Sequence, residues 1–132
     1  MKTPRCCRIL FWTTMFSLSV VVGCGPKAGA KKAIDQGTAA YDKGDFDLSI
    51  TCFTEAIRLK RDDAWAYYGR GSSYLEKNHF DKAVADFTEA IRLKPDFAEA
   101  YYNRGLAYKS SGNVDNANVD FARAKELGRA TK

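Results

Sequence analysis

An eight-residue segment, Phe-Thr-Glu-Ala-Ile-Arg-Leu-Lys, occurs twice in this chain, at Phe53–Lys60 and at Phe87–Lys94. The two copies begin 34 residues apart, and a degraded third copy begins a further 34 residues along the chain, at Phe121. An identity of this length is very improbable by chance in a chain of 132 residues. A fixed period of roughly 20–50 residues is the signature of a repeat protein, in which each unit packs only against its neighbours. We therefore interpret the chain as an array of three units.

Each unit contains two blocks of apolar and small residues with the spacing of an amphipathic helix, separated by a short turn segment. The three turn segments are Gly44-Asp-Phe, Lys77-Asn-His-Phe80 and Ser110-Ser-Gly-Asn113. The sequence therefore predicts an all-α fold built from three helix-turn-helix units. Their expected bounds are residues 30–63, 64–97 and 98–131.

The junction between the second and third units carries signals for the end of one helix and the start of the next. Pro95 ends the helix before it, because proline cannot continue the backbone hydrogen-bond ladder. Asp96 is expected to cap the following helix, with Glu99 three residues later in the spacing of a capping box.

From about residue 30 to the C-terminus the pattern resembles the tetratricopeptide repeat (TPR). Each unit has the small residue that the family places in its first helix, and the large aromatic and later alanine of its second helix. These residues are Gly37, Gly71 and Gly105; Phe53, Phe87 and Phe121; and Ala56, Ala90 and Ala124. The resemblance implies a right-handed superhelical solenoid, in which the first helices line a concave groove that holds a peptide or a helix of a partner protein. Packing gives these residue types a physical reason, because a glycine such as Gly71 lets Phe87 fill the space between two closely packed helices.

Aromatic side chains occupy the register of the expected groove. Trp65, Tyr68 and Tyr102 stand where a fully solvated helix face would carry charge, and Trp and Tyr are frequent anchors of interfaces. The alternative is that some of them pack against neighbouring helices. The residues predicted to bind the partner are Lys31, Tyr41, Trp65, Tyr68, Leu75, Glu99, Tyr102 and Leu106.

One branch of the TPR family holds the C-terminal carboxylate of chaperones in a clamp of Lys, Asn and Arg side chains. The positions equivalent to this clamp are Ile34, Thr38, Gly69, Glu99 and Asn103. Only Asn103 could serve, and it stands where the family has Arg, so we expect no such clamp here.

The outer face of the last helix is polar where the corresponding faces of the first two units are apolar. A terminal repeat needs a polar outer face, because no further repeat covers it. We therefore expect the last helix to close the array without a separate capping helix. The residues compared are Ile50, Val84 and Asn118 in one register, and Ile57, Ile91 and Lys125 in the other.

The N-terminus has the composition of a targeting segment. Lys2, Arg5 and Arg8 precede an apolar run over residues 9–22, and residues 1–23 contain no acidic residue. The apolar run has about the length of the hydrophobic core of a signal peptide. Because three of the 21 basic residues and none of the 16 acidic residues lie in this segment, the rest of the chain is close to neutral.

The end of this run, Val21-Val-Gly-Cys24, resembles the lipobox of bacterial lipoproteins. The resemblance implies that residues 1–23 are a signal peptide cleaved before Cys24, that Cys24 carries a diacylglycerol group, and that residues 24–29 form a short tether. Val21 stands where Leu is usual, which is a mild departure. The alternatives are a plain secretory signal and an uncleaved membrane anchor.

The remaining residues offer no constellation for catalysis or for a cofactor. The single histidine, His79, lies in a turn, and no phosphate-binding loop, paired carboxylates or metal-ligand cluster is present. The near-neutral repeat region lacks the basic stripe of a nucleic-acid binder. We therefore expect a protein that is not an enzyme, has no cofactor or metal and binds no nucleic acid.

Cysteine usage adds one expectation about the repeat region. Removal of residues 1–23 and acylation of Cys24 would leave Cys52 as the one remaining thiol, so no intramolecular disulfide is expected. Its register equivalents are Asp86 and Asp120, which predicts that Cys52 lies on a partly exposed helix face.

Together these patterns predict a lipid-anchored adaptor or scaffold of the bacterial cell envelope, which binds a protein or peptide partner in its groove and faces the periplasm or the exterior. Gly25 after the lipidated cysteine, rather than Asp, suggests the outer membrane if the organism has one. The alternatives are a regulatory subunit of a cell-envelope (peptidoglycan) enzyme and a secreted or membrane-anchored adaptor without the lipid.

Overall fold

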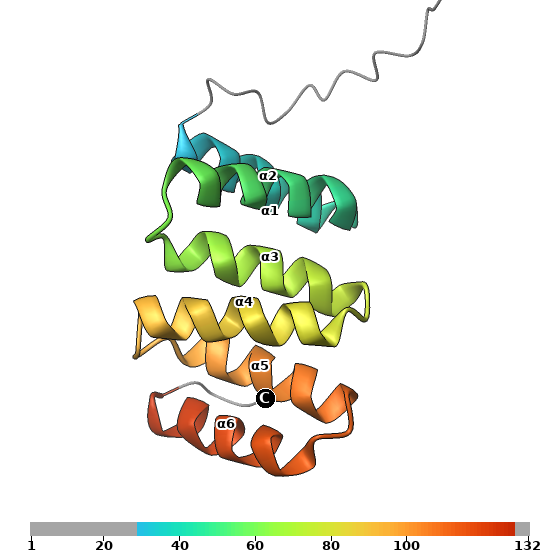
Figure 1. Ribbon diagram of the computed structural model, residues 1–132, viewed down its shortest axis with the longest axis vertical. Helices are drawn as coiled ribbons and strands as arrows, with labels where there is room; N and C mark the ends of the chain where they lie inside the picture. Colours follow the sequence, from blue (N-terminus) through green and yellow to red (C-terminus); the bar gives the residue numbers. More distant parts are fainter. Residues whose placement is uncertain (1–28, 129–132) are drawn as a thin grey trace, which may run out of the picture.

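The computed structural model describes residues 29–128, and all regular structure in this part of the chain is α-helical. The helices are α1 (Ala30–Asp42), α2 (Phe46–Leu59), α3 (Ala64–Glu76), α4 (Phe80–Leu93), α5 (Ala98–Ser110) and α6 (Val114–Glu126). They pair as three helical hairpins, which confirms the predicted all-α fold of three helix-turn-helix units (Figure 1). The predicted signal peptide and Cys24 lie outside the described residues.

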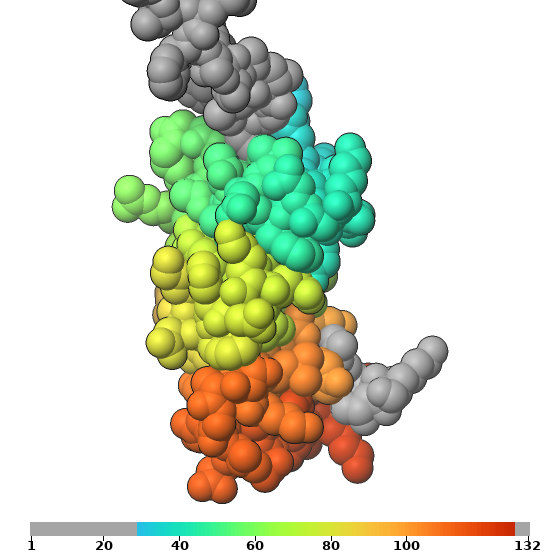
Figure 2. Space-filling view, turned by 90° about the vertical axis from the view of Figure 1, so that its right-hand side faces the viewer, coloured from blue at the N-terminus to red at the C-terminus, as the bar shows by residue number. Residues whose placement is uncertain are grey.

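The hairpins stack along the long axis of the molecule, with α1 and α2 at one end and α5 and α6 at the other (Figure 1). The sequence colours succeed one another along this axis in the space-filling view, so that each hairpin forms its own layer (Figure 2). The first helices α1, α3 and α5 contact one another in order, whereas the second helices of the described chain do not. The array therefore curves toward its first helices, and they form its concave face.

The turns inside the three hairpins share one backbone geometry. Gly44, Asn78 and Gly112 occupy the same register and have φ angles of 76°, 59° and 87°. This left-handed conformation reverses the chain tightly and favours Gly or Asn over other residues. The next position caps the second helix in two of the hairpins. Asp45 accepts a hydrogen bond from the Leu48 backbone, and Asn113 accepts one from the Asn116 backbone.

Glycines in the first helices make room for the phenylalanines of the second helices. A Cβ atom added at Gly71 would lie 3.0 Å from the Phe87 ring, and one at Gly105 would lie 2.7 Å from the Phe121 ring. This contact confirms the packing expected for Gly71. The structure adds one glycine that the register had not singled out, because a Cβ at Gly69 would lie 2.2 Å from the ring of Phe53.

The faces between the units follow the predicted change from apolar to polar. Ile57 packs against a buried cluster that includes Ala66 of α3, and Ile91 packs against a cluster that includes Ala100 of α5. Lys125, the counterpart of these two isoleucines in α6, is exposed, and Asn118 in the second register is exposed as well. The two registers compared therefore carry exposed polar side chains in α6.

The predicted cap of α5 was wrong by one residue. Phe97, and not Asp96, occupies the capping position, and its side chain is 1% exposed and makes no capping hydrogen bond. The corresponding residue before α3 is Asp63, whose carboxylate accepts a hydrogen bond from the Trp65 backbone. Burial of a large aromatic side chain outweighs a helix cap, which contributes only about 1 kcal/mol.

The predicted exposure of Cys52 was also wrong, because its side chain is fully buried. The prediction relied on Asp86 and Asp120 in the same register, and both of these carboxylates are buried too, at 6% and 3% exposure. Each is paired with an arginine of the preceding helix, Arg70 or Arg104. The register is therefore an inward-facing one, and ion pairing allows it to hold aspartate.

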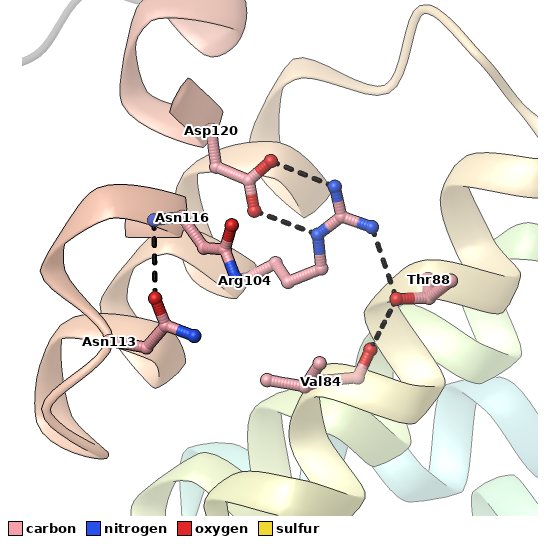
Figure 3. A network of polar contacts seen from close by, with 6 residues as sticks. All are labelled: Val84, Thr88, Arg104, Asn113, Asn116 and Asp120. Carbon is pink, nitrogen blue, oxygen red and sulfur yellow. Dashed lines mark hydrogen bonds and ion pairs between the residues drawn. The ribbon is translucent and has the colours of Figure 1, made fainter. Parts of the chain in front are cut away.

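Each of these arginines connects three successive helices, and Figure 3 shows the contacts of Arg104. Arg104 of α5 donates from Nε and Nη2 to the Asp120 carboxylate of α6, at 2.7 and 2.8 Å, and from Nη1 to Thr88 Oγ1 of α4, at 3.1 Å. Arg70 of α3 makes the same contacts one repeat earlier, to Asp86 of α4 and Thr54 of α2. We call each set an arginine staple, because one guanidinium joins its own hairpin to the preceding one.

Candidate functional site

A hollow of about 270 Å³ opens on the concave face, between α1 and α3. Helices α1 and α3 supply most of its walls, Phe53 of α2 forms part of its floor, and Asn103 of α5 reaches its far side. The lining residues are Ile34, Thr38, Tyr41, Phe53, Trp65, Tyr68, Gly69, Ser72 and Asn103.

An aromatic cluster forms one wall of the hollow. Trp65 is 52% exposed, and its ring contacts Tyr68 edge-on at 5.7 Å and Phe97 at 4.7 Å between ring centroids. Buried Phe97 also lies 4.9 Å from the Tyr68 ring, so it supports both side chains from below. Lys94 Nζ lies 5.6 Å from the centroid of the Trp65 ring. The indole is therefore held in place while about half of its surface faces water, as in a pre-formed anchor point of an interface.

The polar groups of the hollow are largely engaged with the protein. Thr38 Oγ1 donates to the Ile34 carbonyl at 3.0 Å, and Ser72 Oγ donates to the Tyr68 carbonyl at 2.9 Å. Asn103 Nδ2 donates to Tyr68 Oη at 3.0 Å, which ties α5 to α3 across the hollow. Hydroxyl protons used in this way are not available to a ligand, so the walls present mainly hydrocarbon and aromatic surface.

Acidic groups lie at one end of the hollow. Tyr41 Oη donates to Glu76 Oε1 at 3.2 Å, and Asp42 follows Tyr41 at the end of α1. Burial, together with the charge and hydrogen bond of Glu76, raises the pKa of Tyr41 from 10.0 to about 12. The lining residues include no Lys, Arg or His. The hollow thus has no charged lining residue, carries carboxylates at the C-terminal ends of α1 and α3, and has the cation of Lys94 beside Trp65.

The structure brings three of the eight predicted groove residues together at the hollow, namely Tyr41, Trp65 and Tyr68. Among the other five, Leu75 packs against the buried cluster around Phe87, and Tyr102 contacts the Phe121 ring at 5.4 Å. Lys31 and Glu99 are exposed and Leu106 is half-buried, and none of these three lines the hollow.

Sequence reasoning did not assign Phe53, Gly69 or Phe97 to the site. Phe53 and Gly69 act together, since the missing side chain of Gly69 is what lets the Phe53 ring reach the hollow. A comparison of the repeats could have singled out Gly69, because the equivalent positions hold residues with side chains, Asp35 in α1 and Asn103 in α5. Phe97 gave a weaker signal, because it stands at a junction between units.

Residues 29–128 contain no group of three or more His, Cys, Asp or Glu side chains that could hold a metal ion. None of the helices in this range has both the length and the apolar character needed to cross a bilayer.

Stacked helical hairpins with a pre-formed hollow on the concave side define the class of repeat scaffolds that bind other proteins. A family profile described as a TPR repeat matches residues 37–78 and 71–112, and a second, described as a tetratricopeptide repeat, matches residues 98–129. The chain belongs to the tetratricopeptide repeat family. A comparison with curated proteins returned no match.

Solved TPR structures resemble the chain over most of its length. The TPR domain of OM64 from Arabidopsis is 30% identical, with a TM-score of 0.76 over 79% of this chain and 86% of that domain. The second TPR domain of human RPAP3, in complex with the HSP70 peptide SGPTIEEVD, is 28% identical, with a TM-score of 0.76 over 82% of this chain and 90% of that one. MamA is 32% identical, with a TM-score of 0.72, and the match covers 75% of this chain and 58% of MamA.

Proposed function

We propose that this protein is a peptide-binding adaptor of the bacterial cell envelope, held at a membrane by lipid on Cys24, and that its concave face binds a segment of a partner protein. The observation that carries the binding part is the anchor formed by Trp65. This large side chain is half exposed above a hollow, and a buried aromatic holds it in position. A side chain that is already ordered loses little conformational entropy on binding, which favours affinity.

Related TPR structures support a peptide as the ligand. The RPAP3 domain holds a peptide of HSP70 or of HSP90, and the TPR2B domain of yeast Sti1, at 26% identity and a TM-score of 0.73, forms a complex with Hsp70. This chain has the same fold and an open hollow on the concave face. An extended peptide or a partner helix is therefore the class of ligand that we propose.

The membrane part of the proposal rests on the sequence before α1. The lipobox-like segment ends at Cys24, and α1 begins at Ala30. An extended tether over residues 24–29 would reach about 20 Å, so an acylated Cys24 would keep the repeats close to the bilayer surface. Stable attachment needs at least two acyl chains, because a single chain binds membranes only marginally.

Binding by the concave face is tested with the variants Trp65→Ala and Tyr68→Ala, using Val119→Ala as a control. Val119 is 68% exposed on α6, away from the hollow, so its substitution matches a loss of exposed apolar surface. We expect the first two variants to lose a partner crosslinked in isolated membranes, and the control to retain it. Unchanged capture by Trp65→Ala would contradict the assignment of the groove.

Lipid attachment is tested separately by mass spectrometry of the mature N-terminus. We expect cleavage before Cys24 and the added mass of a diacylglycerol group, and we expect Cys24→Ser to remove both. A mature protein that begins at another residue and carries no lipid would contradict the anchoring part of the proposal and leave the binding part standing.

A further inference from the structure

The charge at the Tyr41 end of the hollow differs in sign from that expected of a site for acidic peptides. The peptides bound in the RPAP3 complexes, SRMEEVD and SGPTIEEVD, carry acidic residues at their C-terminal ends. A site for such an end needs cations, because a carboxylate loses its hydration on binding. The hollow of this chain has no Lys, Arg or His in its lining. The lining residue Tyr41 donates a hydrogen bond to the Glu76 carboxylate at the C-terminal end of α3, whereas the cation of Lys94 lies beside Trp65, near the N-terminal end of α3.

The negative end of the hollow is built from two helix ends. Glu76 is the last residue of α3 and Asp42 is the last residue of α1, so each carboxylate adds to the partial negative charge of a helix C-terminus. Lys77, the residue after Glu76, is paired with Asp47 of α2, so its charge is already compensated there. Lys43, after Asp42, is exposed.

Resting on the proposed function, we propose that the groove selects an internal peptide segment in which an apolar side chain enters the hollow and a neighbouring Lys or Arg pairs with Glu76. The hollow offers the apolar side chain a neutral wall formed by Ile34, Trp65 and Tyr68. Glu76 accepts a hydrogen bond from Tyr41, which itself lines the hollow. A basic residue one or two positions from the apolar one lies about 3–7 Å further along an extended peptide, and its long side chain reaches this carboxylate.

The basic residue also has a favourable setting for its charge. Glu76 is exposed, so the pair forms without the large desolvation cost of a buried ion pair. Burial is the main cause of the raised pKa of Tyr41, and the field of Glu76 adds to it, because a neighbouring carboxylate disfavours a further negative charge at this end of the hollow. The same field repels the terminal carboxylate of an acidic peptide.

The test uses the purified full-length chain in detergent micelles and two libraries of random 12-residue peptides. One library presents the peptide between two folded domains, and the other presents it at a free C-terminus. We expect the internal library to yield segments with an apolar residue next to Lys or Arg, and no dependence on a free carboxylate. Enrichment of acidic segments, or selection from the free-end library alone, would overturn the proposal.

A matched pair of variants then tests the role of the carboxylate. An enriched peptide is labelled and its affinity measured by fluorescence anisotropy for wild type, Glu76→Gln and Glu89→Gln, the last of which removes one charge from α4 at a residue outside the hollow. We expect Glu76→Gln to weaken binding about three- to fivefold at low salt and the Glu89 variant to change nothing. The Glu76 effect should shrink at high salt, where the pair is screened.

The two proposals fail in different ways. Peptides that bind wild type and Glu76→Gln equally, but are lost with Trp65→Ala, would refute the pairing with Glu76 and leave the groove function intact. Capture of no peptide from either library would contradict peptide binding by the groove and, with it, this inference.

Discussion

The staple between Arg104 and Asp120 can be broken from one side by the substitution Asp120→Ala. The carboxylate receives two charge-assisted hydrogen bonds from the guanidinium, at 2.7 and 2.8 Å, and its side chain is 5% exposed (Figure 3). Without it, Arg104 keeps one hydrogen bond, to Thr88. The arginine is then a cation in a largely buried position without its counter-ion.

The size of the effect follows from how buried the pair is. Removing one partner of a fully buried ion pair costs about 3–5 kcal/mol, because the other charge is left uncompensated. The Arg104 side chain is 17% exposed, so water can reach part of the guanidinium. We therefore expect Asp120→Ala to lower the free energy of unfolding by about 2–3 kcal/mol. The double variant Arg104→Met, Asp120→Ala leaves no unpaired charge and should lose about 1 kcal/mol less.

Urea unfolding followed by circular dichroism measures these differences, with Glu126→Ala as the control. Glu126 also pairs with an arginine, Arg123 of α6, but both side chains of this pair are well exposed, at 66% for Glu126 and 49% for Arg123. Its loss should change the free energy of unfolding by at most about 0.5 kcal/mol. Hydrogen exchange should show lost protection in α5 and α6 before α1, because repeats interact only with their neighbours. An Asp120→Ala variant as stable as the Glu126 control would refute the reasoning.

Two further predictions concern the hollow. Gly69→Ala places a methyl group 2.2 Å from the ring of Phe53, which also lies close to Gly37. We expect a net loss of about 1–2 kcal/mol in the free energy of unfolding, after the higher helix propensity of Ala is counted, as measured by urea unfolding. Val119→Ala, at a side chain that is 68% exposed, should be near neutral as the control. Because the pKa of Tyr41 is raised to about 12 in the folded protein, the contribution of neutral Tyr41 to stability should be complete below pH 10 and lost as the pH rises from 10 to 12. Tyr41→Phe should remove this part of the pH dependence of the free energy of unfolding. A Tyr41 hydroxyl that titrates near pH 10 by ultraviolet absorbance would contradict this prediction.

The six helices could be predicted because the repeats specify them redundantly. The octapeptide at Phe53–Lys60 and Phe87–Lys94 sets the register of the second helices, and glycine recurs opposite their phenylalanines. Each unit packs its helices with the same residue types, so the 34-residue period is enough to predict the helices. The period does not predict contacts that differ from one unit to the next.

The error at Cys52 shows where the period misleads, and the error at Asp96 shows where a local motif does. Cys52 was judged from Asp86, but a buried aspartate is stable only because Arg70 lies beside it, and the pairing crosses between helices. In the first unit the arginine position is Gln36, whose Oε1 is buried without a hydrogen-bond partner among the described residues. At the start of α5 the prediction followed the local capping-box spacing of Asp96 and Glu99, whereas the 34-residue period from Asp63 places the capping position at Phe97.

The candidate site could be predicted only in outline. Register placed Tyr41, Trp65 and Tyr68 on the first helices, and these three do line the hollow. The depth of the hollow depends on Gly69 and Phe53, which belong to different helices, and such a pair is visible only once the helices are packed. Leu75 shares the register of Tyr41 but packs against the buried cluster of Ala83, Phe87 and Ala107. Tyr41 instead contacts the Phe46 ring and reaches Glu76 with its hydroxyl, a contact that the shorter Leu75 side chain cannot make.

The central claim is that the partner binds on the concave face formed by α1, α3 and α5. A photo-crosslinking amino acid placed at Trp65, and in a second protein at Val119 on α6, tests it most directly in intact membranes. We predict that the probe at position 65 crosslinks a partner protein and that the probe at position 119 does not. Crosslinks from position 119 alone, or equal yields from both positions, would contradict the account.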